Sequence, residues 1–142
     1  MCYRLRNGVG ETSPFSSGVF INEFGESTYL SSTDFDLEAT GEWTSPRSGA
    51  VYPSGWKLSV PRVLLDLTIA PVLEDQELDT RGTTMIVYWE GACDVKGTAA
   101  ENEVEGKAYV ELVGYDRSHD QPNLARFLLG DTFESLTKWF AG

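Results

Sequence analysis

Apolar and polar residues alternate along much of the chain, and the longest such stretch covers residues 85–115. Successive side chains of a strand point to opposite faces of a sheet, so Trp89 and Glu90 belong to different faces. The pattern predicts two strands over residues 85–96 and 104–115, joined by a polar turn. Each strand has one apolar face and one face that carries carboxylates and tyrosines.

Shorter alternating stretches predict further strands at residues 1–6, 15–22, 27–31, 34–39, 57–60 and 63–70. Between them lie an irregular loop over residues 43–56 and an acidic connection over residues 71–84. The connections are mostly short and sequential, which favours an up-and-down antiparallel barrel over a sandwich. The expected fold class is therefore mainly β, with a lipocalin-like barrel domain over residues 1–118.

After Tyr115 the pattern changes to helical spacing, so residues 119–142 are predicted to form a short C-terminal helical tail. No helix of three or more turns is expected before residue 116. Asp131 is a good N-cap for the second of two short helices. The tail is too apolar to stay in water. We expect it to dock on the chain's own barrel, the alternative being a contact with another chain, and deletion of residues 120–142 then to abolish folding.

With 142 residues the chain is long enough for one domain with a substantial core. Its formal net charge of -11 argues against nucleic acid and against an anionic membrane surface as partners. An uncharged or cationic partner fits this charge better. No apolar run reaches transmembrane length, and no secretory signal follows Met1. If Met1 is the true start, we expect a soluble, cytoplasmic protein.

The chain offers little for a metal or a cofactor. Its two cysteines, Cys2 and Cys93, lie far apart in sequence, and His119 is its single histidine. This composition predicts no zinc or transition-metal site. It also makes a Ser-His-Asp triad less plausible, because His119 would be the only histidine that could act as its base. No glycine-rich phosphate loop follows a strand, so no nucleotide cofactor is expected.

Four blocks of sequence, in this order, resemble one known family: WTSPRSGAVYPSGWKLSVP, LDLTIAPVLEDQEL, YWEGACDVKG and GKAYVELVGY. The family is that of carotenoid 1,2-hydratase (hydroxyneurosporene synthase), which includes the AttH-like proteins and is similar to kievitone hydratase. The resemblance covers residues 1–115. Members have two calycin-like β domains in tandem, and this chain resembles the second. The resemblance leaves two alternatives: a naturally single-domain member, or part of a longer protein, with an N-terminal partner domain or a partner subunit.

The same resemblance implies a cofactor-independent enzyme of the hydratase (hydro-lyase) or cyclase type. Its substrate would be an apolar small molecule of polyene or isoprenoid character, held in a barrel cavity. A second interpretation from a different class is a non-catalytic, lipocalin-like module that binds an apolar ligand or a protein. Turnover lost in Glu90→Gln or Glu111→Gln, with the fold intact, would separate the two.

Hydration of an alkene needs an acid that protonates carbon, and burial can keep a carboxyl group protonated near neutral pH. The candidate catalytic residues are the strand acids Glu90, Glu111 and Asp66. The alternative for the two glutamates is the outer barrel face, in a pair with Arg or Lys or against a partner domain. For Asp66, the alternative is a structural role in which its carboxylate accepts hydrogen bonds from backbone N–H groups. The acids of the 71–84 connection are interpreted as a solvated loop.

Aromatic faces can stabilise a cation and form the walls of an apolar site. The candidate ligand-binding residues are the aromatic side chains of the 43–56 loop and of the long hairpin, namely Trp43, Tyr52, Trp56, Tyr88, Trp89 and Tyr109. We expect the loop to cover one barrel end, with at least one of its rings reaching the interior. It would then form either a ligand mouth or a plug. Arg47 would bind a ligand oxygen or pair with a barrel carboxylate.

Overall fold

The computed structural model describes residues 1–7 and 10–116. Its elements are antiparallel strands and one short 3-10 helix: β1 (Cys2–Tyr3), β2 (Ser17–Ile21), β3 (Ser27–Ser31), β4 (Asp36–Ala39), β5 (Glu42–Thr44), β6 (Val51–Pro53), β7 (Trp56–Val60), η1 (Pro61–Val63), β8 (Leu65–Pro71), β9 (Glu77–Asp79), β10 (Val87–Ala99) and β11 (Asn102–Val113). The mainly β, antiparallel class predicted from the sequence is confirmed. The expectation of no helix of three turns before residue 116 also holds for the described residues.

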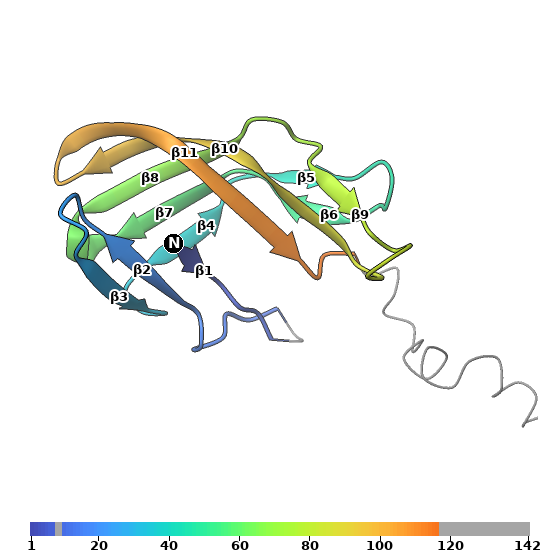
Figure 1. Ribbon diagram of the computed structural model, residues 1–142, viewed down its shortest axis with the longest axis horizontal. Helices are drawn as coiled ribbons and strands as arrows, with labels where there is room; N and C mark the ends of the chain where they lie inside the picture. Colours follow the sequence, from blue (N-terminus) through green and yellow to red (C-terminus); the bar gives the residue numbers. More distant parts are fainter. Residues whose placement is uncertain (8–9, 117–142) are drawn as a thin grey trace, which may run out of the picture.

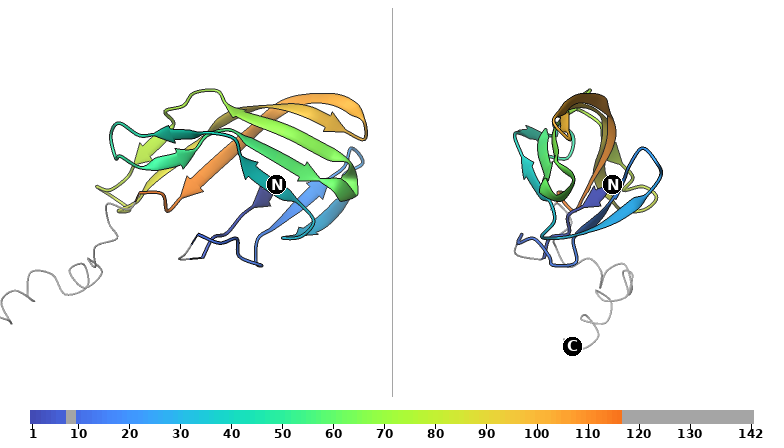
Figure 2. Two further views of the ribbon diagram at one scale, coloured as in Figure 1. Left: turned by 180° about the vertical axis from the view of Figure 1, so that it is seen from behind. Right: turned by 90° about the vertical axis from the view of Figure 1, so that its left-hand side faces the viewer.

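The main sheet has the strand order β11-β10-β8-β7-β4, and β9 pairs with β10 beside this path. It curls into a half-barrel (Figures 1 and 2). A separate three-stranded sheet, β1-β2-β3, lies across its concave side, and β5 and β6 form a hairpin at one end. The barrel is therefore open, with β4 and β11 at the two ends of the main sheet.

Strand alternation divides the main sheet into an apolar inner face and a polar outer face. On β7 and β8, the residues Trp56, Val60 and Ile69 are buried, whereas Lys57 and Thr68 between them are exposed. Apolar side chains thus line the concave side of β4, β7, β8, β10 and β11. The core cluster gathers at the end near the β5–β6 hairpin, where Ala50, Tyr52, Trp56, Ile69, Trp89 and Cys93 pack together.

The β10–β11 hairpin has a shorter turn than the sequence pattern predicted. Its strands have 13 and 12 residues, and only Ala100 and Glu101 lie between them. Both residues have positive φ angles, of 46° and 69°. Two-residue hairpin turns need this geometry, which Asn and Gly adopt more easily than Ala and Glu. The predicted hairpin is present, but its strands meet closer to the turn than expected, because β10 ends at Ala99 and β11 begins at Asn102.

Three other local predictions are corrected by the structure. The 43–56 loop is not irregular throughout, because it contains the β5–β6 hairpin. The 71–84 connection contains β9, which pairs with β10. The strand expected at residues 63–70 begins at Leu65, because Pro61 starts the 3-10 turn η1 instead. Strands of three residues are too short to show an alternating period, which is why the pattern missed them.

The predicted helical tail and the 118/119 domain boundary lie outside the described residues, so both stay predictions. Among the residues that are described, no helix is long and apolar enough to cross a membrane.

Candidate functional site

The concave side of the main sheet borders a hollow of about 2160 Å³ that is open to solvent. Its wall is formed by the inward-facing apolar residues of the main sheet, which include Leu37, Trp56, Leu58, Val60, Leu65, Leu67, Ile69, Val95, Val104, Ala108, Val110 and Leu112. The three-stranded sheet adds Cys2, Phe20 and Leu30 from the opposite side. A wall of this composition suits an apolar ligand.

The predicted aromatic residues of the 43–56 loop are at one end of this hollow. Tyr52 and Trp56 are buried in the core, so the expected contact of the loop with the interior is confirmed. Trp43 stacks on Tyr52 with ring centroids 6.0 Å apart, and Tyr52 in turn lies 5.5 Å from Tyr115. Trp56 itself lines the hollow. Whether these rings touch a ligand stays a prediction.

Trp89 contributes to the same core from β10. Its ring centroid lies 6.1 Å from that of Trp56, and its indole N–H donates to the Glu74 carbonyl oxygen at 2.7 Å. The indole is 2% exposed. Trp89 therefore packs against Trp56, which lines the hollow. Its hydrogen bond also holds the segment around Glu74 that leads to β9.

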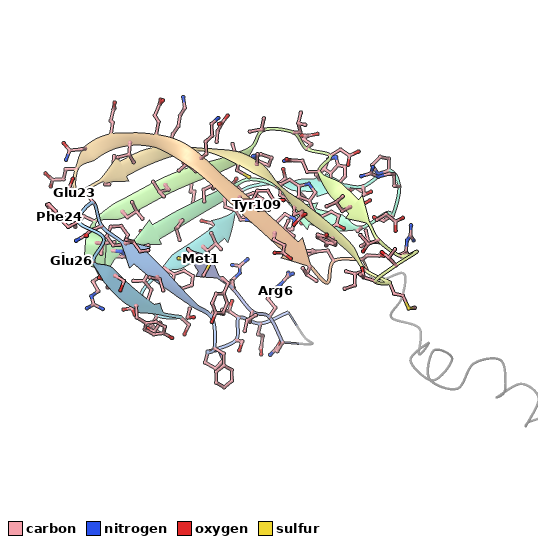
Figure 3. All side chains as sticks on the ribbon, viewed as in Figure 1. Met1, Arg6, Glu23, Phe24, Glu26 and Tyr109 are labelled. Atoms are coloured by element: carbon pink, nitrogen blue, oxygen red, sulfur yellow. The ribbon has the colours of Figure 1, made fainter. Side chains whose placement is uncertain are left out.

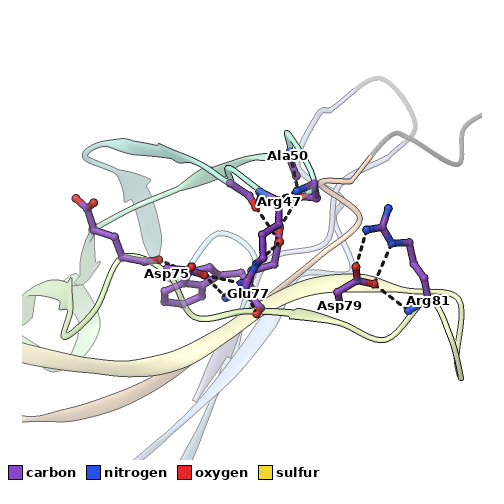
Figure 4. A network of polar contacts seen from close by, with 10 residues as sticks. Arg47, Ala50, Asp75, Glu77, Asp79 and Arg81 are labelled. Atoms are coloured by element: carbon purple, nitrogen blue, oxygen red, sulfur yellow. Dashed lines mark hydrogen bonds and ion pairs between the residues drawn. The ribbon is translucent and has the colours of Figure 1, made fainter.

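A buried carboxylate that the sequence pattern missed joins the β5–β6 hairpin to β9 (Figure 4). The side chain of Glu77 has no exposed surface and accepts hydrogen bonds from Ser45 Oγ at 2.8 Å and Ser48 Oγ at 2.5 Å. Arg47 Nε lies 3.5 Å from the same carboxylate. Glu77 is thus not a solvated loop acid, as had been predicted, but the centre of a polar network.

Arg47 is held by the same network. Its Nη2 donates to Asp75 Oδ1 at 2.6 Å and to the Glu77 carbonyl oxygen at 2.7 Å. Of the two roles considered for this arginine, the contacts present are those of a pair with carboxylates. The sequence did contain one indication of this network. Ser45, Arg47 and Ser48 lie close together and all carry hydrogen-bond donors, which an acidic side chain could accept.

Tyr52 places its phenol beside this network without a hydrogen bond of standard geometry. Burial raises the pKa of the Tyr52 phenol far above its ordinary value of 10.0, and the neighbouring Glu77 carboxylate raises it further. The phenol therefore stays neutral under all ordinary conditions.

The remaining predicted residues of the long hairpin share the outer face of β10 and β11. Glu90 and Glu111 are directly opposite each other in the strand register. Desolvation raises the pKa of the Tyr109 phenol, and the nearby Glu90 carboxylate and Tyr88 add to this shift. The structure thus brings these four residues together. Glu111 and Tyr109, on the edge strand, lie at the rim of the hollow.

Asp66 is separate from that group. It is exposed on the outer face of β8, where it faces Ser59 of β7 in the strand register. Its neighbours on this face include Asp36, Glu38, Lys57 and Thr68. The apolar wall and Asp66 are on opposite sides of the sheet.

A family model described as AttH-like matches residues 1–115 of the chain. The chain belongs to the AttH-like family. Among solved structures, this AttH-like chain is similar to a crystal structure described as AttH from Nitrosomonas europaea, with 27% identity and a TM-score of 0.70. The alignment covers 82% of this chain and 34% of that one.

The AttH-like chain also has the fold of part of kievitone hydratase from Nectria haematococca, with 19% identity and a TM-score of 0.62. That alignment covers 79% of this chain and 33% of the hydratase. The AttH-like chain therefore spans about a third of the length of both solved structures. No curated protein matches it.

The described part of the AttH-like chain contains no group of three or more His, Cys, Asp or Glu side chains arranged to hold a metal ion. Cys2 and Cys93 are both free thiols.

Proposed function

We propose that this chain is the ligand-binding β domain of a cofactor-independent, hydratase- or cyclase-type AttH-like protein. Its ligand is an apolar small molecule with polyene or isoprenoid character, as in the carotenoid 1,2-hydratases that the sequence resembles. One observation supports this most directly: the inner face of the open sheet is apolar from β4 to β11 and surrounds a hollow. Burial of a ligand there removes apolar surface from water on both sides.

A binding experiment tests the first half of this proposal. All-trans-retinol, a neutral polyene, is expected to quench the fluorescence of the chain, because Trp56 lines the hollow and Trp89 packs against Trp56. Val110→Glu introduces a charge on the inner wall and should weaken binding at least tenfold. Thr68→Glu adds the same charge on the outer face and should leave binding unchanged. Equal affinity in both variants would place the ligand elsewhere.

The chemistry proposed is the addition of water to an alkene. A carboxylic acid donates its proton to one alkene carbon, water bonds to the other, and the water then returns a proton to the carboxylate. Glu111 lines the rim of the hollow and faces Glu90. Like charges directly opposite each other destabilise a sheet, so this pair has a cost that a functional role would explain. All three candidates lie on the outer face, and Asp66 is the least well placed because it neither lines the hollow nor faces a residue that does.

Mass spectrometry after incubation with a polyene in ¹⁸O-labelled water tests the second half. A hydratase would add one labelled water to the product, and Glu111→Gln would abolish this gain while retinol binding persists. Binding without any labelled product, in the chain and in a longer protein that contains it, would favour the non-catalytic module instead. No binding by the wild-type chain would remove both alternatives.

A further inference from the structure

One long edge of the main sheet has no strand beside it in the described part of the chain. β11 is the last strand of this sheet, and β10 is its neighbour on the other side. The β10–β11 ladder runs through twelve consecutive pairs without a bulge. Natural sheets protect such an edge with proline, a bulge or charges, because its N–H and C=O groups attract another strand. β11 contains neither a proline nor a bulge, so its charges decide what can pair with it.

The backbone groups at this edge belong to the odd-numbered residues of β11. On β10, the Glu90 N–H donates to the Gln76 carbonyl oxygen, on the side away from β11. Backbone direction alternates along a strand, so the odd-numbered residues of β10 bond to β11, where their register partners are even-numbered. No backbone hydrogen bond between described residues reaches the outward groups of residues 103, 105, 107, 109, 111 and 113. Tyr109, labelled in Figure 3, marks this edge strand.

Side-chain charges on the outer face form two short rows that end at this edge. Lys107 pairs with Asp94, and Lys96 Nζ lies 3.5 Å from the Glu105 carboxylate. Each pair joins β10 to β11 directly across the ladder. One row therefore ends at the edge with a negative charge, and the next row ends with a positive one. The Glu105 and Lys107 side chains are 78% and 76% exposed, so both are accessible to a further strand.

A second copy of the chain would complete both rows at one register. If β11 pairs antiparallel with itself about a two-fold axis at Gly106, Glu105 faces the partner's Lys107, and Lys107 faces the partner's Glu105. Each row then has four charges of alternating sign, from Lys96 through Glu105 to the partner's Lys107 and the partner's Asp94. Opposite charges in facing positions stabilise paired strands, and like charges destabilise them. An axis shifted by one residue would place Glu105 or Lys107 against its own copy.

The same register suits the backbone and the inner face of the sheet. It pairs odd-numbered residues with odd-numbered ones, so the unused N–H and C=O groups of both copies meet. Gly106 lies on the axis in a non-hydrogen-bonded pair, where Cα atoms are about 4.5 Å apart. A Cβ at Gly106 would have no atom within 4 Å, so this position is open. Beside it, Ala108 would face the partner's Val104 and so continue the apolar inner wall.

We propose that the edge of β11 is a self-association surface, at which two copies of the chain pair antiparallel about Gly106 into one continuous sheet. The alternating charges select a second copy over other extended segments, because a different sequence would not place opposite charges at both positions. This inference does not depend on the proposed function, since it uses the outer edge of the sheet and not the ligand in the hollow.

A cysteine on the axis tests the register. Gly106→Cys places two thiols face to face, at a Cα separation that a disulfide can bridge. The full chain with this change should form a disulfide-linked dimer under mild oxidation, as seen on a non-reducing gel. Ala108→Cys would face the partner's Val104 and should give no such dimer. Cys2 and Cys93 are present in both variants, so they do not affect the comparison. Equal crosslinking of the two variants, or none in either, would overturn the proposal.

Two opposite charge changes test the rows. Lys107→Glu and Glu105→Lys each leave two like-charged pairs in a homodimer. Each should raise the dimer dissociation constant at least tenfold, as measured by sedimentation equilibrium at about 150 mM NaCl. In an equal mixture the two variants regain both opposite pairs, so heterodimers should form where neither variant dimerises alone. Lys57→Glu, a matched change at an exposed position of β7, should associate as wild type does.

Two results would overturn the proposal outright. A wild-type chain that sediments as a monomer at about 100 µM would leave the edge to a strand of a different sequence. A dimer whose dissociation constant neither charge variant changes would have its interface elsewhere. Should a charge variant lose the circular dichroism spectrum of wild type, the comparison of Gly106→Cys with Ala108→Cys still decides. None of these results affects the ligand site, because retinol binding is measured separately.

Discussion

Glu77 shows how one residue fixes the position of a whole loop. Its carboxylate accepts from Ser45 and Ser48 and faces Arg47, so three residues of the β5–β6 connection are held against β9. The Ser45 hydroxyl also accepts from the backbone N–H groups of Arg47 and Ser48, which shapes the turn. A buried charge is stable only when it is paired and hydrogen-bonded, and here both conditions are met.

Removal of this carboxylate should cost much of the stability of the domain. Glu77→Ala leaves buried donors without an acceptor, and we expect the free energy of unfolding to fall by about 3–5 kcal/mol. Urea denaturation measures this change. Glu74→Gln, at an exposed position of the same connection, should change stability by less than about 0.5 kcal/mol. A Glu77→Ala protein as stable as Glu74→Gln would show that the network does not hold the loop.

Tyr52 should make stability depend on alkaline pH. Its folded-state pKa lies above the ordinary value of 10.0, so the folded protein keeps the phenol proton that the unfolded chain releases. Stability therefore falls as pH rises beyond about 10. Tyr52→Phe keeps the ring packing and loses no standard hydrogen bond, so its stability at pH 7 should stay within about 1 kcal/mol of wild type.

Thermal unfolding between pH 8 and 11 is the measurement. The melting temperature of wild type should drop more steeply than that of Tyr52→Phe. Both proteins will lose some stability, because the pKa values of the Tyr109 and Tyr115 phenols and of the two thiols are raised too. Identical curves for the two proteins would mean that Tyr52 ionises as easily folded as unfolded.

At the scale of elements, the close pairing of β10 with β8 depends on one glycine, Gly97. A Cβ on Gly97 would lie 2.0 Å from the Asp66 carbonyl oxygen and 2.9 Å from the Leu67 Cα. These are backbone atoms, so the contact cannot be relieved by a rotamer change. Gly106, on the neighbouring β11, has nothing within 4 Å of the same added atom. The two glycines therefore have different roles on adjacent strands of one sheet.

This difference predicts opposite effects of the same substitution. Gly97→Ala forces β10 away from β8 and should lower the free energy of unfolding by about 1–3 kcal/mol. Gly106→Ala meets open space and should be neutral, or stabilising by up to about 1 kcal/mol, because alanine loses less backbone entropy than glycine. Chemical denaturation of the two variants decides this. Equal losses at both sites would contradict a close approach at Gly97.

Long elements were predictable from sequence and short ones were not. The 13 residues of β10 show a period of two clearly, and so do the 12 of β11. β5, β6 and β9 have three residues each, and their pairing depends on partners far along the chain. The burial of Glu77 was missed for the same reason. An acid in a polar stretch of sequence is expected to be solvated, and only the pairing of β5 with β6 shows that this hairpin covers it. The aromatic contact of the 43–56 loop with the interior was predictable, because three large rings in one loop are more than it can leave exposed without losing the free energy of burial.

At the scale of the whole molecule, acidic residues dominate. The formal net charge is -11, and exposed acids occur on both sheets, as in Glu23 of the β2–β3 turn and Glu103 of β11. Such self-repulsion keeps a protein soluble but destabilises its compact state. Cross-strand pairs such as Lys107 with Asp94 and Lys96 with Glu105 offset it only locally.

Added salt should therefore stabilise the fold. The melting temperature of wild type is expected to rise between 20 and 200 mM NaCl, because screening weakens the repulsion between exposed charges. The variant with Glu23→Lys and Glu103→Lys carries four fewer units of negative charge and should show a smaller rise. A melting temperature that falls with NaCl would indicate that favourable ion pairs outweigh the repulsion.

The open form of the main sheet has a mechanical consequence. In a closed barrel the strand number and the stagger of the strands set the diameter. Here the sheet ends at β4 and at β11, so its curvature can change while every ladder hydrogen bond between neighbouring strands is kept. Ligands of different width could then be accommodated by a change in the curvature of the sheet, whereas a closed barrel would exclude the wider ones. Such a hollow discriminates poorly by width, and its selectivity must come from the length of the ligand and from the groups at its ends.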